Sequence, residues 1–423
     1  MSEYIKERES STLEFKSQYT KEALKTVSAY ANYGTGTILF GVKDDGEVIP
    51  LEDPNKMALT IENAINDSIS PVPKYKIHIK STTGPVELIV QEGKEKPYYY
   101  KNRAYRRDDA SSRPVDTTAL NRLVLEGENL SFDQVRAQNQ DLSFNYFKKE
   151  FLEKTDLEDV NLDILRTLGL YSNRDGYNRG AELLADENVY PGVDIVRFGS
   201  NISVIMDRVQ IEHVSILEAF ENAMETFRKY YQYEVVEGAR REAHERLPIT
   251  AFREALANSL IHRLWDVAGD VQVSMFEDRI EITSPGPLPE ELSEEEYWNR
   301  RVSICRNPVL ADVFLKLHII ERFGTGTLRI KEAYEEYLQQ PRFEQTEHYL
   351  TITLPVIDIP MDLSLDEKAV LGAMNSSMSL NRNEVQALTG MERSKAIRTL
   401  NSLIEKGLIE KYGEAKATQY KKT

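Results

Sequence analysis

The chain has 423 residues, one cysteine, six histidines and a formal net charge of −16. Its length predicts two to four domains, each large enough for its own core. The negative charge excludes a protein with a uniformly basic surface, so any contact with nucleic acid must be local. The single cysteine, Cys305, excludes an internal disulfide and a cysteine-clustered zinc site, and the histidines show no ligand spacing. The first residues are too charged for a signal peptide, and no apolar run approaches the ~20 residues that span a bilayer. We therefore expect a cytoplasmic protein without membrane contact.

Residues 1 to 130 are predicted to form one α+β unit. Apolar periodicity indicates a helix near Lys21 to Tyr33 and a strand from Thr37 to Val42, followed by a turn at Asp44-Asp-Gly46. Two more strands are expected at residues 74–81 and 86–90.

The segment from Lys94 to Arg107 interleaves four tyrosines with six basic residues. Basic side chains pair with phosphates, and aromatic rings stack on bases or sugars. The residues predicted to bind nucleic acid here are Lys101, Arg103, Tyr105, Arg106 and Arg107. The alternative is a β-hairpin whose tyrosines pack inside while its lysines and arginines face water.

Three separated blocks of this unit resemble the Schlafen/AlbA-like DNA-binding domain. They run from Glu9 to Lys16, from Ser28 to Asn32 and from Gly36 to Val42, in the order found in that family. The resemblance covers most of residues 1 to 125 and implies an α+β domain that binds DNA. One departure is Gly34-Thr-Gly36, where the family has adjacent glycines.

The same resemblance implies an alternative activity. In some Schlafen proteins the matching carboxylates form a metal-dependent ribonuclease site, and the matching positions here are Glu9, Glu14 and Asp44. Clustered carboxylates can hold Mn²⁺ or Mg²⁺, which generates hydroxide and stabilises charge on a scissile phosphate. Lys16 would neutralise that phosphate. Residues at these positions can equally be inert, solvent-exposed acids.

The segment from Arg253 to Arg263 predicts a helix with Glu254, Asn258 and His262 on one stripe. A carboxylate and an amide carbonyl four residues apart offer the hard oxygen ligands that Mg²⁺ prefers. The alternative is a helix with ordinary polar surface residues. Two later segments add a strand that runs into a turn, residues 280–288, and a glycine loop before a helix, residues 322–327.

This order of segments resembles the GHKL ATPase fold, most closely its RecG C-terminal-like branch, over roughly residues 170 to 355. The resemblance implies a central α/β sandwich that holds ATP and Mg²⁺. Glu254 and Asn258 match the helix that binds Mg²⁺, and the nucleotide-binding glycines would be Gly286, Gly324 and Gly326. Ser284 stands where working members carry the aspartate that reads adenine, so adenine recognition is not implied.

Three helical segments and a hairpin follow residue 360. The helices are predicted at residues 365–374, 382–388 and 392–406, and the hairpin at residues 408–420. This is the plan of a winged helix-turn-helix. On the third helix we expect Ile397, Leu400, Leu403 and Ile404 to face the core, and Arg393, Ser394, Lys395 and Arg398 to face outward toward a major groove.

The charge of this last segment supports a contact with DNA. From Asp366 onward the chain carries ten Lys or Arg against seven Asp or Glu, which is a mildly basic module within an acidic chain. The alternative is a winged helix that pairs with protein.

The sequence as a whole predicts an α+β multidomain protein. The expected domains are a Schlafen/AlbA-like domain in 1–130, connecting helices and a RecG C-terminal/GHKL-like domain in 131–360, and a winged helix in 361–423. No Gly-x-x-x-x-Gly-Lys-Ser/Thr phosphate loop is present, so a RecG-type motor is not supported.

We interpret the chain as a transcriptional regulator that binds double-stranded DNA and forms a homo-oligomer, with the central domain serving ligand sensing or assembly. The rival hypotheses are enzymes. One is a Schlafen-like nuclease that uses Glu9, Glu14 and Asp44, and the other is a GHKL-type ATPase.

Overall fold

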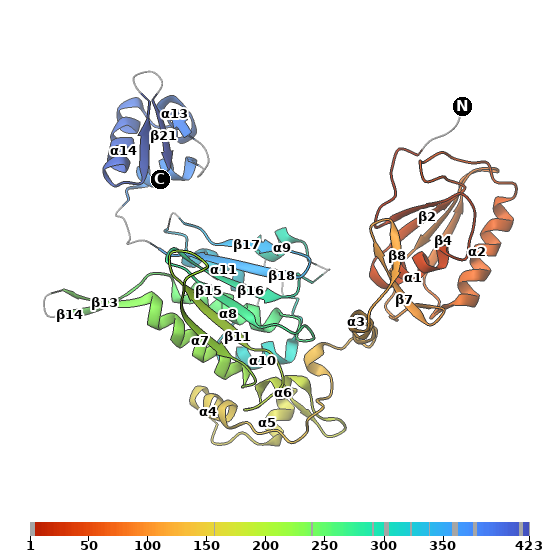
Figure 1. The fold of residues 1–423 in the computed structure, drawn as a ribbon, viewed down its shortest axis with the longest axis horizontal. Helices are drawn as coiled ribbons and strands as arrows, with labels where there is room; N and C mark the ends of the chain where they lie inside the picture. Colours follow the sequence, from red (N-terminus) through yellow and green to blue (C-terminus); the bar gives the residue numbers. More distant parts are fainter. Residues whose placement is uncertain are drawn as a thin grey trace. The chain divides into compact units, whose positions relative to one another are not determined.

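The computed structural model describes residues 5–155, 157–237, 240–289, 292–299, 304–321, 324–337, 339–357, 363–374, 379–413 and 418–422. The chain divides into two compact units, Met1–Val135 and Arg136–Thr423 (Figure 1). Both units mix helices and strands, which confirms the α+β multidomain class. Within the described ranges no helix is long and apolar enough to cross a membrane.

The N-terminal unit contains two four-stranded sheets, ordered β1-β2-β5-β4 and β3-β6-β7-β8. Strands β1 and β2 are parallel, and the other neighbouring pairs are antiparallel. The strands are β1 (Leu13–Lys16), β2 (Gly36–Phe40), β3 (Ile69–Ser70), β4 (Tyr75–Ile79), β5 (Val86–Val90), β6 (Tyr99–Tyr100), β7 (Arg103–Asp108) and β8 (Ser111–Pro114). The helices are α1 (Ala23–Tyr33), α2 (Pro54–Ser68) and α3 (Thr117–Gly127), followed by a 3-10 turn at Phe132–Gln134.

Helix α1 is the centre of the N-terminal core, and its buried polar residues are bonded to the tyrosine-rich segment. Ser28 Oγ donates to the Tyr98 carbonyl at 2.7 Å. Asn32 binds the same residue twice, because its Oδ1 accepts from the Tyr98 N–H at 2.7 Å and its Nδ2 donates to the Tyr98 carbonyl at 3.0 Å. Buried polar groups are stable only with such partners. The Ser28 and Asn32 pair, one helical turn apart, therefore anchors the segment that carries the predicted basic patch.

The second unit is built around a six-stranded sheet with the order β12-β11-β15-β16-β18-β17. Strands β11 and β15 are parallel and the other neighbouring pairs are antiparallel. The strands are β11 (Val193–Phe198), β12 (Ile205–Ile211), β15 (Val271–Met275), β16 (Arg279–Pro285), β17 (Arg342–Gln345) and β18 (Tyr349–Pro355). The helices of this part are α7 (Ile216–Tyr231), α8 (Ile249–His262), α9 (Glu294–Asn299), α10 (Pro308–Lys316) and α11 (Gly326–Ala333).

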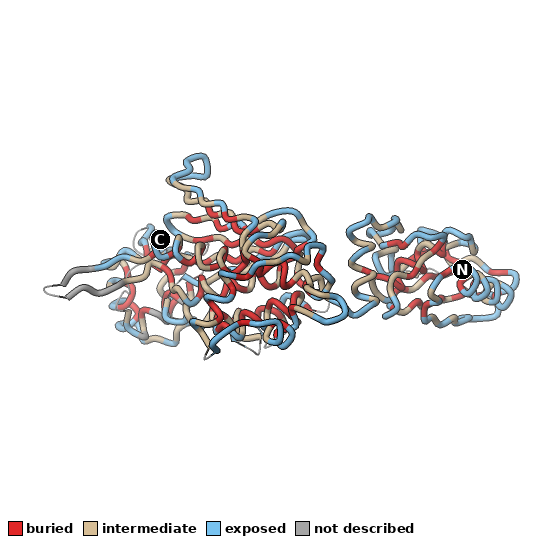
Figure 2. Tube along the Cα trace, turned by 90° about the horizontal axis from the view of Figure 1, so that it is seen from below, coloured by how far each residue is buried: buried red, intermediate tan, exposed pale blue. Residues whose placement is uncertain are grey.

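Burial alternates along the central strands, as in β16, where every second side chain from Ile280 onward is buried. Such alternation means that one face of the sheet is covered and the other is not. Helices α7 and α8 pack on the covered face, and the rings of Phe227 and Phe252 stack between them at 4.4 Å. Figure 2 shows buried positions concentrated in the interior and exposed positions along the surface. This is the two-layer sandwich expected for the central domain.

Smaller elements precede and follow this sheet. They are α4 (Asn145–Lys154), α5 (Leu162–Thr167), β9 (Tyr171–Ser172), β10 (Gly176–Tyr177), α6 (Arg179–Leu184), β13 (Gln232–Glu237) and β14 (Arg240–Glu245). Strands β9 and β10 pair with each other, as do β13 and β14.

The C-terminal segment forms three helices and a three-stranded sheet. They are α12 (Leu365–Ala373), β19 (Ser379–Asn381), α13 (Arg382–Thr389), α14 (Arg393–Glu405), β20 (Ile409–Tyr412) and β21 (Gln419–Lys422), and the sheet order is β19-β21-β20. Val385, Leu400 and Leu403 lie in its apolar core. Gly390 ends α13 in the left-handed region, with φ of 69°, so a short turn can join α13 to α14.

The predicted elements agree with most of these, but three differences have clear causes. Helix α2 was not predicted because only a few of its fifteen residues are buried, so its apolar period is weak. Strand β1 is too short for a periodicity argument. Ile397 was predicted to face the core but is 37% exposed, and Ala396 is buried instead. Ala396, Leu400 and Leu403 lie in the buried stripe of α14, and Ile397, about 100° from Ala396 around the helix axis, lies outside it.

The predicted domain boundary after residue 360 and the tip of the C-terminal hairpin, residues 414–417, lie outside the described residues. The boundaries at 130 and 360 stay predictions.

The buried carboxylate of Glu367 connects α12 to α14 and should stabilise the C-terminal segment. It accepts hydrogen bonds from Ser402 Oγ at 2.6 Å and the Ser364 N–H at 2.7 Å, and Lys406 Nζ lies 2.9 Å away. Burial by itself would raise the pKa of Glu367, but the hydrogen bonds from Ser402, Lys406 and Ser364 lower it to about 2. Because the folded pKa is depressed, the stabilisation is complete above the ordinary pKa of 4.5 and is lost as pH falls through about 2.

We expect Glu367→Gln to destabilise the C-terminal segment by about 1–3 kcal/mol at pH 7, because buried donors lose a charged acceptor. Hydrogen exchange of α12 and α14 in the full chain measures this loss, and the difference from the wild type should shrink below pH 4.5. Glu405→Gln, at an exposed position of α14, is the matched control. Equal exchange in both variants at pH 7 would contradict the assigned role.

Candidate functional site

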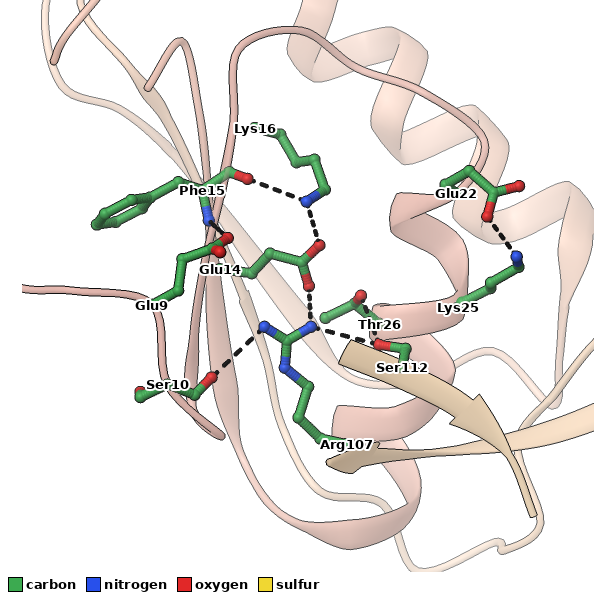
Figure 3. Close-up of polar contacts among 10 residues, drawn as sticks. All are labelled: Glu9, Ser10, Glu14, Phe15, Lys16, Glu22, Lys25, Thr26, Arg107 and Ser112. Atoms are coloured by element: carbon green, nitrogen blue, oxygen red, sulfur yellow. Dashed lines mark hydrogen bonds and ion pairs between the residues drawn. The ribbon is translucent and has the colours of Figure 1, made fainter. Parts of the chain in front are cut away.

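Glu14 lies at the centre of a buried charge cluster in the N-terminal unit (Figure 3). Strand β1 places its carboxylate between two cations. Oε1 is 2.5 Å from Lys16 Nζ, and Oε2 accepts from Arg107 Nη1. The Glu14 and Arg107 side chains are only 6% and 5% exposed. Arg107 comes from β7, so this pair connects the two sheets of the unit.

The neighbours of this pair complete its polar environment. Arg107 Nη2 donates to the Ser10 carbonyl at 3.4 Å and Nη1 donates to Ser112 Oγ at 3.4 Å. The guanidinium also lies 5.9 Å from the centre of the Tyr30 ring. Burial raises the pKa of Tyr30, so its hydroxyl is protonated at neutral pH.

The three carboxylates predicted to hold a catalytic metal are not brought together. Glu9 Oε1 accepts from the Phe15 N–H at 2.9 Å, and Glu14 is closed by Lys16 and Arg107. Asp44 is exposed. No group of three or more His, Cys, Asp or Glu side chains suited to a metal occurs within the described ranges. As placed, these residues do not fit a divalent ion, so we derive no catalytic step through one.

The tyrosine-rich segment divides into an inward and an outward set. Tyr105 is 6% exposed and belongs to the core, and Arg107 is held by Glu14. Tyr105 and Arg107 are two residues apart in β7, so they face the same side of the strand, and that side is the inward one. The geometry therefore gives no support to the prediction that these two side chains bind nucleic acid directly. The side chains that remain exposed are Lys101, Arg103 and Arg106.

A cavity of about 470 Å³ lies beside Lys101. Tyr19, Tyr99 and Tyr100 line it together with Lys21 and Lys101. Lys101 and Asn102 form the β6–β7 turn with φ of 49° and 60°. The Lys101 ammonium lies 5.2 Å from the centre of the Tyr100 ring. Aromatic walls with cations at the rim suit a nucleotide base and its phosphate. The sequence indicated the cations and tyrosines but not that Tyr19 and Lys21 join them.

In the second unit, α8 and α11 bring together three of the predicted nucleotide-binding residues. A Cβ added at Gly326 would lie 2.7 Å from Asn258 Nδ2 and 3.3 Å from Glu254 Oε2, so any larger residue would require the Asn258 amide to move. Glu254 is 2% exposed, and its Oε1 lies 3.1 Å from Arg253 Nη2 and 3.6 Å from Arg329 Nη1. Burial raises the pKa of Glu254, and the two arginines oppose that shift.

These contacts determine whether Glu254 and Asn258 could bind Mg²⁺. Oε1 of Glu254 already faces two guanidinium groups, and Oε2 of Glu254 and the Asn258 amide lie close to Gly326. The donor set, as placed, does not fit Mg²⁺, and no step through ATP follows from it. Arg329 was missed in the sequence because α8 and α11 are far apart along the chain, and Arg253, although next to Glu254, was given no role.

The other predicted nucleotide-binding residues lie at the turn after β16. Ser284 is buried, and Gly286, with φ of 111°, faces the Arg306 guanidinium. Arg306 donates to the carbonyls of His262 at 2.7 Å and Pro287 at 2.9 Å. Burial lowers the pKa of His262 to about 4, and the charge of Arg306 acts in the same direction, so the imidazole is neutral at pH 7. Residues 322 and 323 of the predicted glycine loop lie outside the described residues, and Gly324 follows them with φ of 59°.

Helix α14 exposes all the side chains predicted to contact DNA. Arg393, Lys395 and Arg398 are exposed, and Lys395 Nζ lies 2.7 Å from Asp366 Oδ1. This ion pair is at the surface, where such pairs contribute little and can exchange partners. The exposed Ile397 adds an apolar contact to this face, which the sequence analysis had assigned to the core.

Comparisons with known proteins agree with the domain types expected from the motifs. Residues 9–116 match the family described as "Schlafen, AlbA_2". Residues 269–354 match the family described as "Putative ATP-dependent DNA helicase recG C-terminal". The chain therefore carries a Schlafen/AlbA_2 domain and a RecG C-terminal domain. Glu254 and Asn258 lie outside the second match.

Solved structures extend this result to the fold of the chain. The DIP2311 protein from Corynebacterium diphtheriae is 15% identical, with 98% of this chain and 95% of that chain covered and a TM-score of 0.50. That similarity concerns the fold alone. The N-terminal domain of a RecG-related protein from Nitrosomonas europaea is 24% identical over 24% of this chain and 80% of its own, with a TM-score of 0.18. A comparison with curated protein sequences found no match.

The buried pair of Glu14 and Arg107 should contribute to the stability of the N-terminal unit. We expect Glu14→Ala to destabilise the N-terminal unit by about 3–5 kcal/mol, because it leaves the Arg107 charge buried with a lost partner. The double variant Glu14→Ala, Arg107→Met should recover part of that stability, which urea unfolding of the full chain can measure.

Asp44→Ala is the control, because substitution of an exposed residue changes stability by only about 0.5 kcal/mol or less. A Glu14→Ala variant as stable as the wild type, with a metal-dependent RNA cleavage lost, would instead support the nuclease hypothesis.

Proposed function

We propose that this protein is a DNA-binding transcriptional regulator in which a C-terminal winged helix reads base pairs and the N-terminal domain adds contacts to the DNA backbone. The observation that carries the proposal is the outward face of α14, which presents Arg393, Ile397 and Arg398 away from a core of Leu400 and Leu403.

The chemistry of that face suits a major groove. Arginine binds guanine with two hydrogen bonds, and an apolar side chain contacts the thymine methyl group. Helices α13 and α14, joined at Gly390, have the order of a helix-turn-helix, and β20 with β21 has the place of a wing. The basic excess of this segment supports the same assignment.

The N-terminal domain offers the second contact. Lys101, Arg103 and Arg106 are exposed, and Lys101 also lines the cavity together with tyrosines. Cations bind phosphates without regard to sequence, so this surface would supply affinity rather than specificity. The match to the Schlafen, AlbA_2 family supports a nucleic-acid role for this domain.

The DNA-binding proposal is tested by selection from a pool of randomised duplexes, followed by affinity measurements on the enriched duplex. With ~6 phosphate contacts, the affinity should fall about a thousandfold between 50 and 200 mM salt. Arg393→Gln and Arg398→Gln should each cost about 1–3 kcal/mol and relax the selected sequence. Lys101→Gln should weaken all duplexes equally and reduce the salt dependence.

The matched control is Lys56→Gln, an exposed cation on α2 that lies outside the described cavity. If no duplex is enriched and binding does not depend on salt, the regulator proposal is wrong, and the winged helix would then serve protein pairing.

We further propose that the protein assembles into a homo-oligomer through strand β12. This strand is an edge of the six-stranded sheet, and it and the turn before it expose Ile202, Ile205 and Met206 at 71%, 59% and 60%. An edge strand with apolar side chains is a template for pairing with another chain. Antiparallel pairing of β12 with its copy would give the two-fold symmetry that suits a regulator of palindromic DNA.

Light scattering on the intact protein tests the assembly. We expect a dimer for the wild type and a monomer for the double variant Ile205→Glu, Met206→Glu, since charges at the interface oppose burial. Leu59→Glu, an exposed apolar position on α2, is the control and should leave the mass unchanged. A wild type that is monomeric at tens of micromolar contradicts the proposal.

A further inference from the structure

The second unit contains a cavity of about 260 Å³ that no predicted site includes. It lies among α4, α7, α8 and the turn after α10. Its apolar lining consists of Phe220, Met224, Leu317 and Ile319, and its charged lining consists of Lys154, Glu221, Arg228 and Arg253, with His318 beside them.

The apolar side chains that line the cavity are almost fully buried. Phe220 and Met224 are 2% and 3% exposed, and Leu317 and Ile319 are 1% and 6% exposed. Ligand pockets are usually larger, from about 300 Å³, with mostly apolar walls and a few polar groups that fix orientation. The cavity therefore fits only a small ligand with one ring or a short branched chain.

The charged lining is predominantly cationic, with three cations against the single carboxylate of Glu221. Lys154 is partly neutralised, because its Nζ lies 3.2 Å from Glu150 and 3.9 Å from Glu221. Arg228 is exposed and forms no ion pair within the part of the chain that the structure describes. The buried Nε of Arg253 has no hydrogen-bond partner among the described residues.

Arg228 is exposed and the Arg253 side chain is 36% exposed, so a ligand oxygen can reach both side chains. Arginine binds carboxylates in a planar, two-point geometry. A ligand that contacts both the apolar and the cationic lining must therefore combine an apolar body with an anionic group.

We propose that this cavity binds a small organic carboxylate, with its apolar body on Phe220 and Met224 and its carboxylate on Arg228 and Arg253. A neutral compound of the same shape would pack on the apolar side chains but would not pair with the cations. An inorganic anion would pair with the cations but would not pack on the apolar side chains.

The cavity is connected to the predicted nucleotide region through one residue. Arg253 lines the cavity and also contacts Glu254 at 3.1 Å, and Glu254 in turn contacts Arg329 of α11. A carboxylate that binds Arg253 competes with Glu254 for the same guanidinium. Ligand binding thereby changes the contacts that hold α11 on α8, which is how a small molecule would reach the rest of the central domain.

This inference rests on the proposed role of the central domain as a ligand sensor. Its test is binding to the full protein without DNA, so a failure here leaves DNA binding to be judged by its own experiment. The probes for calorimetry are benzoate, phenylacetate and 4-methylpentanoate, with benzamide as the neutral analogue and inorganic phosphate as the anion without an apolar body.

We expect at least one carboxylate to bind and benzamide and phosphate to bind at least about tenfold more weakly, since each lacks one half of the interaction. Arg228→Gln should weaken that carboxylate about tenfold. Arg253→Gln should do the same and tests the connection to Glu254. Lys149→Gln, an exposed cation of α4 that does not line the cavity, should bind as the wild type does.

Three results would overturn the proposal: no binding of any of the three carboxylates at 10 mM, equal binding of benzamide, or unchanged binding in Arg228→Gln. The last variant removes an exposed side chain without an ion pair, so a folding defect does not obscure the result.

Discussion

Two buried carboxylates, Glu14 and Glu254, are each held by cations of the same chain, and the two candidate sites depend on that constraint. A carboxylate that leaves water must be protonated or paired. Glu14 is paired with Lys16 and Arg107, and Glu254 faces Arg253 and Arg329. In both places arginine and lysine take the positions where the resemblances imply a metal ion, so both sites favour a structural role over catalysis.

The pairing in the N-terminal domain also determines which side chains are available to nucleic acid. Ser28 and Asn32 hold Tyr98 on α1, and Arg107 is drawn inward by Glu14. Strand alternation points Arg106 away from Tyr105 and Arg107, and Arg103 is exposed at the first residue of β7. A segment that looks uniformly basic and aromatic in the sequence is therefore divided by the fold into a core face and a solvent face.

The central domain has the expected fold, and contacts within the chain already involve its predicted nucleotide-binding residues. Its two-layer sandwich and its match to the RecG C-terminal family agree with the expected domain type. The resemblance implies that Ser284 stands where working members carry the adenine-reading aspartate, and Gly326 packs directly against Asn258. A fold can keep its architecture while its site changes use. The cavity beside Arg253 provides another place at which such a domain can respond to a small molecule.

The sequence by itself predicted the two domain types that the family comparisons match, many of the helices and strands, and the exposed cations of α14, because these depend on motif order, apolar period and local charge. It did not predict α2, whose apolar period is weak, or that Ala396 rather than Ile397 lies in the core of α14, because adjacent helical residues point about 100° apart. Only the tertiary structure decided that Arg107 binds Glu14, that Arg329 reaches Glu254, and that Arg253 joins a cavity to that carboxylate. These contacts connect residues far apart in the chain or set the direction of a side chain, and local sequence patterns carry no information about either.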